Sequence, residues 1–199
     1  MRKAGIVDYE AFAKQVLAAI PDRPISFEVF SDEFCEMEAQ ATKIAAWGKN
    51  VYVKIPVTNT RGESANPLIS KLAERGVQLN VTALMTVRQV RDTAAAMKNG
   101  PGGYISVFAG RIADTGRDPV PLMREAVTEL SRYPNLELIW ASPRELLNIF
   151  QADEVGCHII TATADLLKKL SLVGKDLDEY SLETVQMFRN DAVQAGFHI

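Results

Sequence analysis

Two kinds of apolar pattern alternate along the chain. Short runs of β-branched and aromatic residues are typical of buried strands, and longer segments with an apolar residue every three or four positions are typical of amphipathic helices. An opening helix over residues 9–20 is followed by six strand–helix units. The predicted strands are Ile25–Phe30, Val51–Val57, Leu79–Met85, Tyr104–Ala109, Leu136–Ala141 and Cys157–Thr161.

The predicted helices have recognisable first and last residues. Asp8, Asp32 and Thr86 are predicted N-caps, and glycines 48 and 76 are predicted helix stops. The helices that follow the strands are expected over residues 32–47, 67–76, 87–97, 119–133, 146–155 and 164–170, with a last one over 181–195. Loops are expected over residues 59–65 and 110–118.

Regular alternation of strands and helices indicates an α/β fold with a parallel sheet covered by helices. Glu28, Lys54, Thr82 and Phe108 recur at intervals of 26, 28 and 26 residues, and no G-x-G-x-x-G motif follows the first strand. This spacing favours a (β/α)8 TIM barrel over a doubly wound nucleotide-binding sheet. Six strand–helix units are present where a closed barrel has eight, so we predict a single, N-terminally incomplete barrel domain over residues 1–199.

One lysine interrupts the strand Val51–Val57. Because successive strand side chains point to opposite faces, Lys54 lies opposite the valines, on the face of Tyr52 and Pro56. Burial lowers the pKa of a lysine, and a neutral amine can attack a carbonyl to form a Schiff base. The alternative interpretation is a structural lysine that reaches solvent or pairs with a carboxylate.

Polar and aromatic side chains are predicted on this same face of neighbouring strands. They are Glu28, Lys54, Asn80, Thr82, Ser106, Phe108, Trp140 and Ser142. In a barrel this face points inward, and active sites lie at the carboxyl ends of the strands. Because buried charges cost stability, such a set indicates a site more than it indicates packing.

Candidate anion ligands follow two later strands. Arg111 comes directly after one strand, and Ser142 and Arg144 lie where the next strand ends and a helix begins. Exposed N–H groups and the helix dipole favour phosphate at such a point. Alternatively, Ser142 is only an N-cap and Arg144 only a solvated side chain.

Composition narrows the possible classes of function. The net charge is −3 without a basic stripe, which argues against nucleic-acid binding, and no apolar run approaches the length of a membrane span. Cys35 and Cys157 are isolated, which fits a reducing cytoplasm better than a disulfide scaffold. No His/Cys/carboxylate cluster suggests a metal site, and no cofactor is predicted.

Four motifs together resemble the transaldolase family, including its fructose-6-phosphate aldolase branch, over nearly the whole chain. They are Val53-Lys54-Ile55-Pro56-Val57-Thr58, Asn80-Val81-Thr82-Ala83, Val107-Phe108-Ala109-Gly110-Arg111-Ile112 and Ala141-Ser142. The resemblance implies a (β/α)8 barrel in which Lys54 forms a Schiff base with the substrate.

Roles for the other site residues come from the same resemblance. Glu28 and Thr82 match the pair that holds a proton-shuttling water, and Asn80 matches a residue that bonds substrate hydroxyls. Three further residues match phosphate ligands: Arg111, Ser142 and, in some members, Arg144. The aldolase branch usually has Gln at position 28 and Tyr at position 108, so Glu28 and Phe108 are closer to transaldolases.

The sequence differs from the family pattern at its N-terminal end. Family members begin with a strand that carries a catalytic aspartate and continue to a strand ending in Thr-Thr-Asn-Pro. Residues 1–6 match the segment directly after that motif, so two strands and one helix have no counterpart. The aspartate would assist C–C cleavage, and the asparagine would orient the substrate.

The leading hypothesis is a transaldolase-like enzyme that transfers a dihydroxyacetone unit between sugar phosphates. The alternatives are a fructose-6-phosphate aldolase-type lyase, a truncated pseudoenzyme that keeps a sugar-phosphate pocket, and a different phosphate-binding epimerase or isomerase. A homo-oligomer is a further expectation. It would form through the last helix, with the candidate contacts Leu182, Val185, Met187 and Phe188; alternatively, that helix packs on the barrel.

Overall fold

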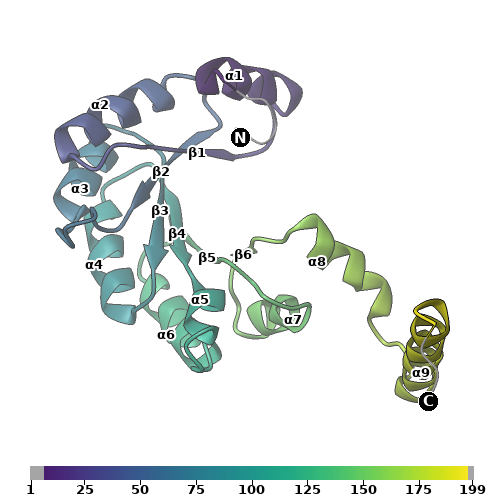
Figure 1. Cartoon of the computed structure of the whole chain (residues 1–199). Helices are drawn as coiled ribbons and strands as arrows, with labels where there is room; N and C mark the ends of the chain where they lie inside the picture. The colour runs from purple at the N-terminus through teal and green to yellow at the C-terminus, as the bar shows by residue number, and fades with distance from the viewer. Residues whose placement is uncertain (1–6, 197–199) are drawn as a thin grey trace. The chain divides into compact units, whose positions relative to one another are not determined.

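A six-stranded, fully parallel sheet forms the centre of the computed structural model, which describes residues 7–196. The strands pair in sequence order, each with the next one along the chain (Figure 1). They are β1 (Ile25–Glu28), β2 (Val51–Pro56), β3 (Leu79–Leu84), β4 (Gly103–Val107), β5 (Leu136–Trp140) and β6 (Ile159–Ile160). The sheet curls along this order, with one face toward helices, as in part of a (β/α) barrel. The predicted α/β fold class is confirmed.

Helices cover the outer face of the curled sheet, one ahead of the first strand and the others after the strands (Figure 1). The first seven are α1 (Tyr9–Ala19), α2 (Phe34–Ala45), α3 (Asn66–Glu74), α4 (Val87–Met97), α5 (Ala109–Ala113), α6 (Val120–Leu130) and α7 (Leu147–Glu154). They are followed by α8 (Ala164–Lys168), a short 3-10 helix (Lys169–Leu172) and α9 (Leu177–Gln194). No described helix is long and apolar enough to cross a membrane.

The chain divides between Ala162 and Thr163 into two compact units. The first contains the sheet with α1 to α7, and the second contains α8, the 3-10 helix and α9. The predicted oligomer contacts on α9 are exposed, and the prediction of an oligomer remains a prediction. The segment 1–6, where the family resemblance begins, lies outside the described residues.

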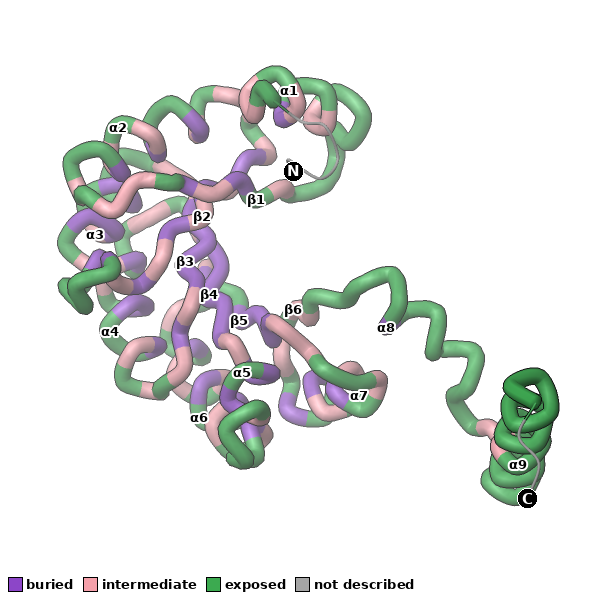
Figure 2. The backbone as a smooth tube through the Cα atoms, viewed as in Figure 1, coloured by how far each residue is buried: buried purple, intermediate pink, exposed green. Residues whose placement is uncertain are grey.

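The main core lies between the sheet and the helices. Val51, Val53 and Ile55 of β2 are at most 3% exposed, whereas the residues between them are half-buried. Buried residues follow the strands and the sheet-facing sides of the helices (Figure 2). Each buried aliphatic side chain contributes about 1.5–3 kcal/mol, so this layer fixes which face of each strand turns away from the helices.

A β-bulge interrupts strand β3 next to Thr82. The register with β4 shifts between Val81 and Leu84, and Ala83 has a φ of 67°. Strict alternation predicts Ala83 on the helix-facing side, but Leu84 occupies that core position with no exposed surface. The extra residue of the bulge reverses the alternation, which the sequence pattern alone does not reveal.

Trp140 also differs from its predicted position. It is completely buried with Leu136 and Leu138 in the helix-side core, whereas Ile139 lies on the opposite face. The position of Ser142 does not indicate which face of the sheet Trp140 lies on, because Ser142 lies beyond β5 and has a φ of 63°. The strict alternation of β5 has ended before that residue.

Two predicted N-caps are confirmed and one is wrong. The side chain of Asp8 accepts a hydrogen bond from the N–H of Ala11, and Thr86 forms a capping box with Gln89. Asp32 does not cap α2, whose N-cap is Glu33. Helix α5 falls within a stretch for which the sequence predicts a strand end and a loop.

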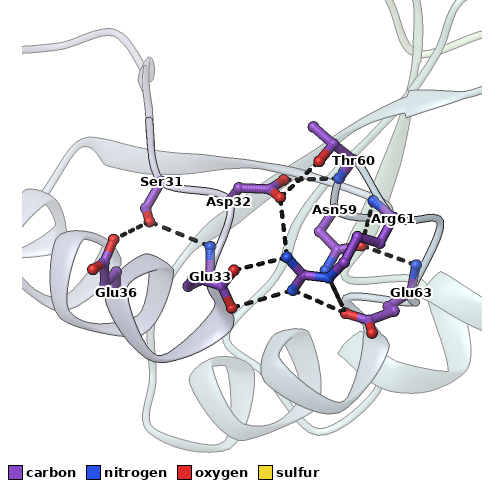
Figure 3. A network of polar contacts seen from close by, with 8 residues as sticks. All are labelled: Ser31, Asp32, Glu33, Glu36, Asn59, Thr60, Arg61 and Glu63. Atoms are coloured by element: carbon purple, nitrogen blue, oxygen red, sulfur yellow. Dashed lines mark hydrogen bonds and ion pairs between the residues drawn. The ribbon is translucent and has the colours of Figure 1, made fainter.

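Asp32 instead ties the loop after β1 to the loop after β2 (Figure 3). Its carboxylate accepts hydrogen bonds from the N–H and the hydroxyl of Thr60, which hold its pKa below the usual range. In the same network, Arg61 binds Glu33 through two nitrogens, at 2.7 and 3.1 Å, and also pairs with Glu63. The two loops beyond Glu28 and Lys54 are therefore fastened to each other.

The bulge requires a positive φ at position 83, and substitutions there can test this requirement. Ala83→Gly should change the free energy of unfolding by less than about 1 kcal/mol, because relief of left-handed strain offsets the added freedom of the unfolded chain. Ala83→Val should lower it by about 2 kcal/mol, because a β-branched residue resists this conformation. Urea unfolding followed by tryptophan fluorescence measures both, and equal stability of the two variants would contradict the required bulge.

Candidate active site

A cavity of about 440 Å³ opens on the inner face of the sheet, opposite the helices. Five of the residues predicted on this face line it: Lys54, Asn80, Thr82, Ser106 and Phe108. Ile139 and Ala141 close its other side. Parallel pairing places these side chains at similar levels, because Lys54 is in register with Asn80, and Pro56 with Thr82.

Lys54 and Glu28 form an ion pair at one side of this cavity. They are register partners on β1 and β2, and the Nζ of Lys54 lies 3.6 Å from Oε2 of Glu28. Their side chains are 30% and 47% exposed, so neither is sealed in the core. The pair that the structural interpretation of Lys54 expects is therefore present, and it also places a proton acceptor beside the amine.

Asn80 is held between two serines. Its Nδ2 donates to Oγ of Ser26 at 2.9 Å, and its Oδ1 accepts from Oγ of Ser106 at 2.8 Å. Because Asn80 is only 6% exposed, these bonds fix the direction of its amide. Ser26 was missed in the sequence, although its position two residues before Glu28 on the same strand face could have revealed it.

Thr82 lines the cavity and carries a buried polar atom without a partner. The residue is 3% exposed, and its Oγ1 has no hydrogen-bond partner among residues 7–196. Buried hydroxyls are nearly always hydrogen-bonded. A hydrogen bond to a water or a substrate group would satisfy this hydroxyl, which the described residues leave unpaired.

Aromatic rings provide the apolar part of the inner face. Tyr52 and Tyr104 stack with ring centroids 4.3 Å apart, and burial raises the pKa of Tyr104. The ring of Phe108 lines the cavity and carries the guanidinium of Arg111 5.5 Å from its centroid. Tyr104 was not predicted as a cavity residue, although it lies two residues before Ser106 on the same strand face.

The three predicted phosphate ligands do not line the cavity but lie on two adjoining segments beyond β4 and β5. A Cβ atom on Gly110, next to Arg111, would lie only 1.5 Å from the carbonyl oxygen of Ser142. The backbone N–H of Ser142 donates to Oγ1 of Thr161. Arg144 forms an ion pair with Asp114, which raises the pKa of this guanidinium.

Ser142 is not the N-cap of the following helix. Helix α7 begins at Leu147, five residues later, and the side chain of Asn148 accepts hydrogen bonds from the N–H groups of Arg144 and Glu145. The alternative interpretation of Ser142 as a cap is therefore wrong. The turn over residues 142–146 is instead an irregular segment whose shape depends on Asn148.

The described residues show no grouping of three or more His, Cys, Asp or Glu side chains that could hold a metal ion. The polar groups nearest to Lys54 come from Glu28, its ion-pair partner, and from its register partner Asn80. Lys54, Asn80 and Thr82 line the cavity, whereas Glu28 does not line it and is connected to it through its ion pair with Lys54.

Comparison with solved structures supports the fold. A mandelate oxidase variant with an FMN adduct matches with a TM-score of 0.54 at 14% sequence identity. The match covers 78% of this chain and 53% of that one, so the chain spans about half the length of the oxidase. At this identity the likeness concerns the fold alone.

Comparison of sequences is more specific. A probable transaldolase of Dehalococcoides mccartyi is 34% identical over 169 residues, covering 84% of this chain and 74% of its own. One of Streptococcus equi is 38% identical, covering 82% and 73%, and one of Thermoanaerobacter is 32% identical, covering 96% and 83%. The profile of the family Transaldolase/Fructose-6-phosphate aldolase matches residues 9–199. The chain belongs to the transaldolase/fructose-6-phosphate aldolase family.

Proposed function

We propose that the protein is a transaldolase-type enzyme that transfers a dihydroxyacetone unit between phosphorylated sugars. The observation that carries this proposal is the place of Lys54, with the Glu28 carboxylate 3.6 Å from its amine and the unpartnered hydroxyl of Thr82 in the same cavity. A Schiff-base mechanism needs an amine, a proton acceptor and a place for water. Family membership supports the choice of substrate class.

The reaction begins when Lys54 gives up a proton and its lone pair attacks C2 of a ketose phosphate. A C–N bond forms, the carbonyl oxygen takes up a proton, and water leaves as the protonated imine forms. In this proposal Glu28 exchanges these protons through a water that also bonds the hydroxyl of Thr82, which is supported by the ion pair of Glu28 with Lys54 and by the unpartnered Oγ1 of Thr82. The protonated imine carries a positive charge on nitrogen, and this charge draws electrons in the next step.

Cleavage follows when the C3–C4 bond breaks and its electron pair flows to the protonated imine. The C4 hydroxyl gives its proton to a water as the aldose phosphate departs, and an enamine remains on Lys54. Asn80 keeps one amide hydrogen and one lone pair beyond its bonds to Ser26 and Ser106. We assign these groups to the hydroxyls of the three-carbon unit.

The phosphate is assigned to Arg111, Ser142 and Arg144, on the two segments that adjoin at Gly110. A guanidinium group suits phosphate because it offers two parallel N–H donors to two oxygens. This assignment rests on the family resemblance and on the contact between the segments. We also propose a cytoplasmic location, because Cys35 and Cys157 are both free thiols.

The aldolase-type lyase is the second candidate function. Release of free dihydroxyacetone requires protonation of the enamine near Lys54, whereas transfer requires that the enamine wait for an aldehyde. The phenyl ring of Phe108 lines the cavity and cannot donate a proton. This residue therefore favours transfer over release.

Trapping with borohydride tests the lysine directly. Reduction in the presence of fructose 6-phosphate should add a stable mass to the peptide that contains Lys54, because it fixes the imine as an amine. Lys54→Met should lose this adduct with little change in stability, since the volume is nearly kept. Lys43→Met, which alters a lysine paired with Glu10, is the matched control and should keep it. An unmodified Lys54 beside a labelled reference transaldolase would refute the proposal and leave a pseudoenzyme or an epimerase.

Phe108→Tyr tests the choice between transfer and release. A tyrosine hydroxyl could protonate the enamine, and general acids of this kind contribute about 10²–10⁴-fold. We expect more free dihydroxyacetone from fructose 6-phosphate, relative to transfer onto erythrose 4-phosphate. Tyr104→Phe, deeper on the same strand, is the control. If wild type already releases the unit as fast as it transfers it, and the variant keeps that ratio, the lyase becomes the better assignment.

A further inference from the structure

Asp114 holds Arg144 in a two-point ion pair. Oδ1 of Asp114 accepts a hydrogen bond from Nε of Arg144 at 3.0 Å, and Oδ2 accepts a second one from a terminal nitrogen. This fork-shaped contact uses one whole edge of the guanidinium. It is the same kind of edge that would bind two phosphate oxygens.

The backbones on both sides of this ion pair are fixed. The N–H of Gly110 donates to the carbonyl of Ala141, and a side chain at position 110 would collide with Ser142. The N–H of Arg144 is held by Asn148 at 2.7 Å. Any release of Arg144 from Asp114 is therefore a swing of side chains, not a movement of the two segments.

The two arginines of this region differ in their partners. Arg111 has no carboxylate within ion-pair distance among residues 7–196, and its guanidinium lies over the ring of Phe108. Arg144 is already neutralised by Asp114. Of the two, Arg111 alone presents an uncompensated charge to an arriving anion.

We propose that Asp114 is an internal competitor for the phosphate group, occupying Arg144 in the free protein and yielding this guanidinium when a phosphate dianion binds. This inference rests on the proposed function, which assigns phosphate to Arg111, Ser142 and Arg144. The side chains of Asp114 and Arg144 are 52% and 47% exposed. Ion pairs this exposed are weak enough to be exchanged for another anion.

Competition has a consequence for selectivity. A ligand with one negative charge attracts Arg144 no more strongly than the single charge of Asp114 does. A phosphate dianion attracts it more strongly, because it carries more charge and presents two oxygens to the guanidinium. Asp114 therefore lowers the affinity for every anion but penalises singly charged anions most. The site gains selectivity for phosphate monoesters at some loss of affinity.

Calorimetric titration with inorganic phosphate at pH 8 and constant ionic strength tests the competition without any need for turnover. Asp114→Asn should bind phosphate about threefold to tenfold more tightly, because Arg144 no longer has to leave a charged partner before it binds the anion. Asp118→Asn is the matched control: it removes a charge from the same loop but contacts the N–H of Val120, not Arg144. The affinity of this control variant for phosphate should stay within about twofold of the wild-type value.

A third variant separates competition from a general charge effect. In an Arg144→Gln background, Asp114→Asn should give no further gain, because there is no guanidinium left to release. Equal or weaker binding by the Asp114 variant, a gain that persists without Arg144, or no phosphate binding by any of the proteins would each overturn the inference. Borohydride labelling of Lys54 in wild type is independent of these titrations, so its failure refutes the proposed function separately.

Discussion

Parallel pairing of neighbouring strands determines where every reactive group of this protein lies. Lys54 is in register with Glu28 on one side and with Asn80 on the other. Because the helix-facing side of each strand is filled by apolar residues, the polar residues between them must face the cavity. A slip of one residue between β1 and β2 would exchange these faces and separate the lysine from its carboxylate.

Two local departures from ideal strands modify this arrangement at its carboxyl end. Ala83 and Ser142 are the non-glycine residues with positive φ among those the structure describes, and they follow Thr82 and Ala141 of the cavity lining. Strained backbone of this kind gathers at functional sites, where the surrounding structure holds it in place. In this protein, Ala83 and Ser142 interrupt the alternation of side-chain direction directly after the cavity-lining residues Thr82 and Ala141.

Much of this arrangement could be predicted from the sequence. Alternating apolar residues indicated the strand faces of Glu28, Lys54 and Thr82, since each face is decided by a local pattern of period two. The position of Ala83 could not be predicted, because a bulge changes the alternation of β3 without a glycine to mark it. Trp140 keeps the alternation of Leu136 and Leu138, so β5 alone predicts its face, and only Ser142 beyond the strand departs from the pattern.

Longer-range contacts also escaped the sequence pattern. Asp32 looked like a helix cap but bonds Thr60, 28 residues away, and Arg144 looked solvated or phosphate-binding but pairs with Asp114, 30 residues away. The choice of partner by a charged side chain depends on which loops meet in space. Propensity and spacing carry little information about that choice.

A crystal structure of the protein reduced by borohydride in the presence of fructose 6-phosphate would test the central claim, that Lys54 and its neighbours form one Schiff-base site. We expect continuous density from Nζ of Lys54 to the second carbon of a three-carbon unit, hydroxyls of that unit bonded to Asn80, and one water shared by Glu28 and Thr82. An adduct on a different lysine, or one on Lys54 that points away from Asn80 and Thr82, would contradict the account.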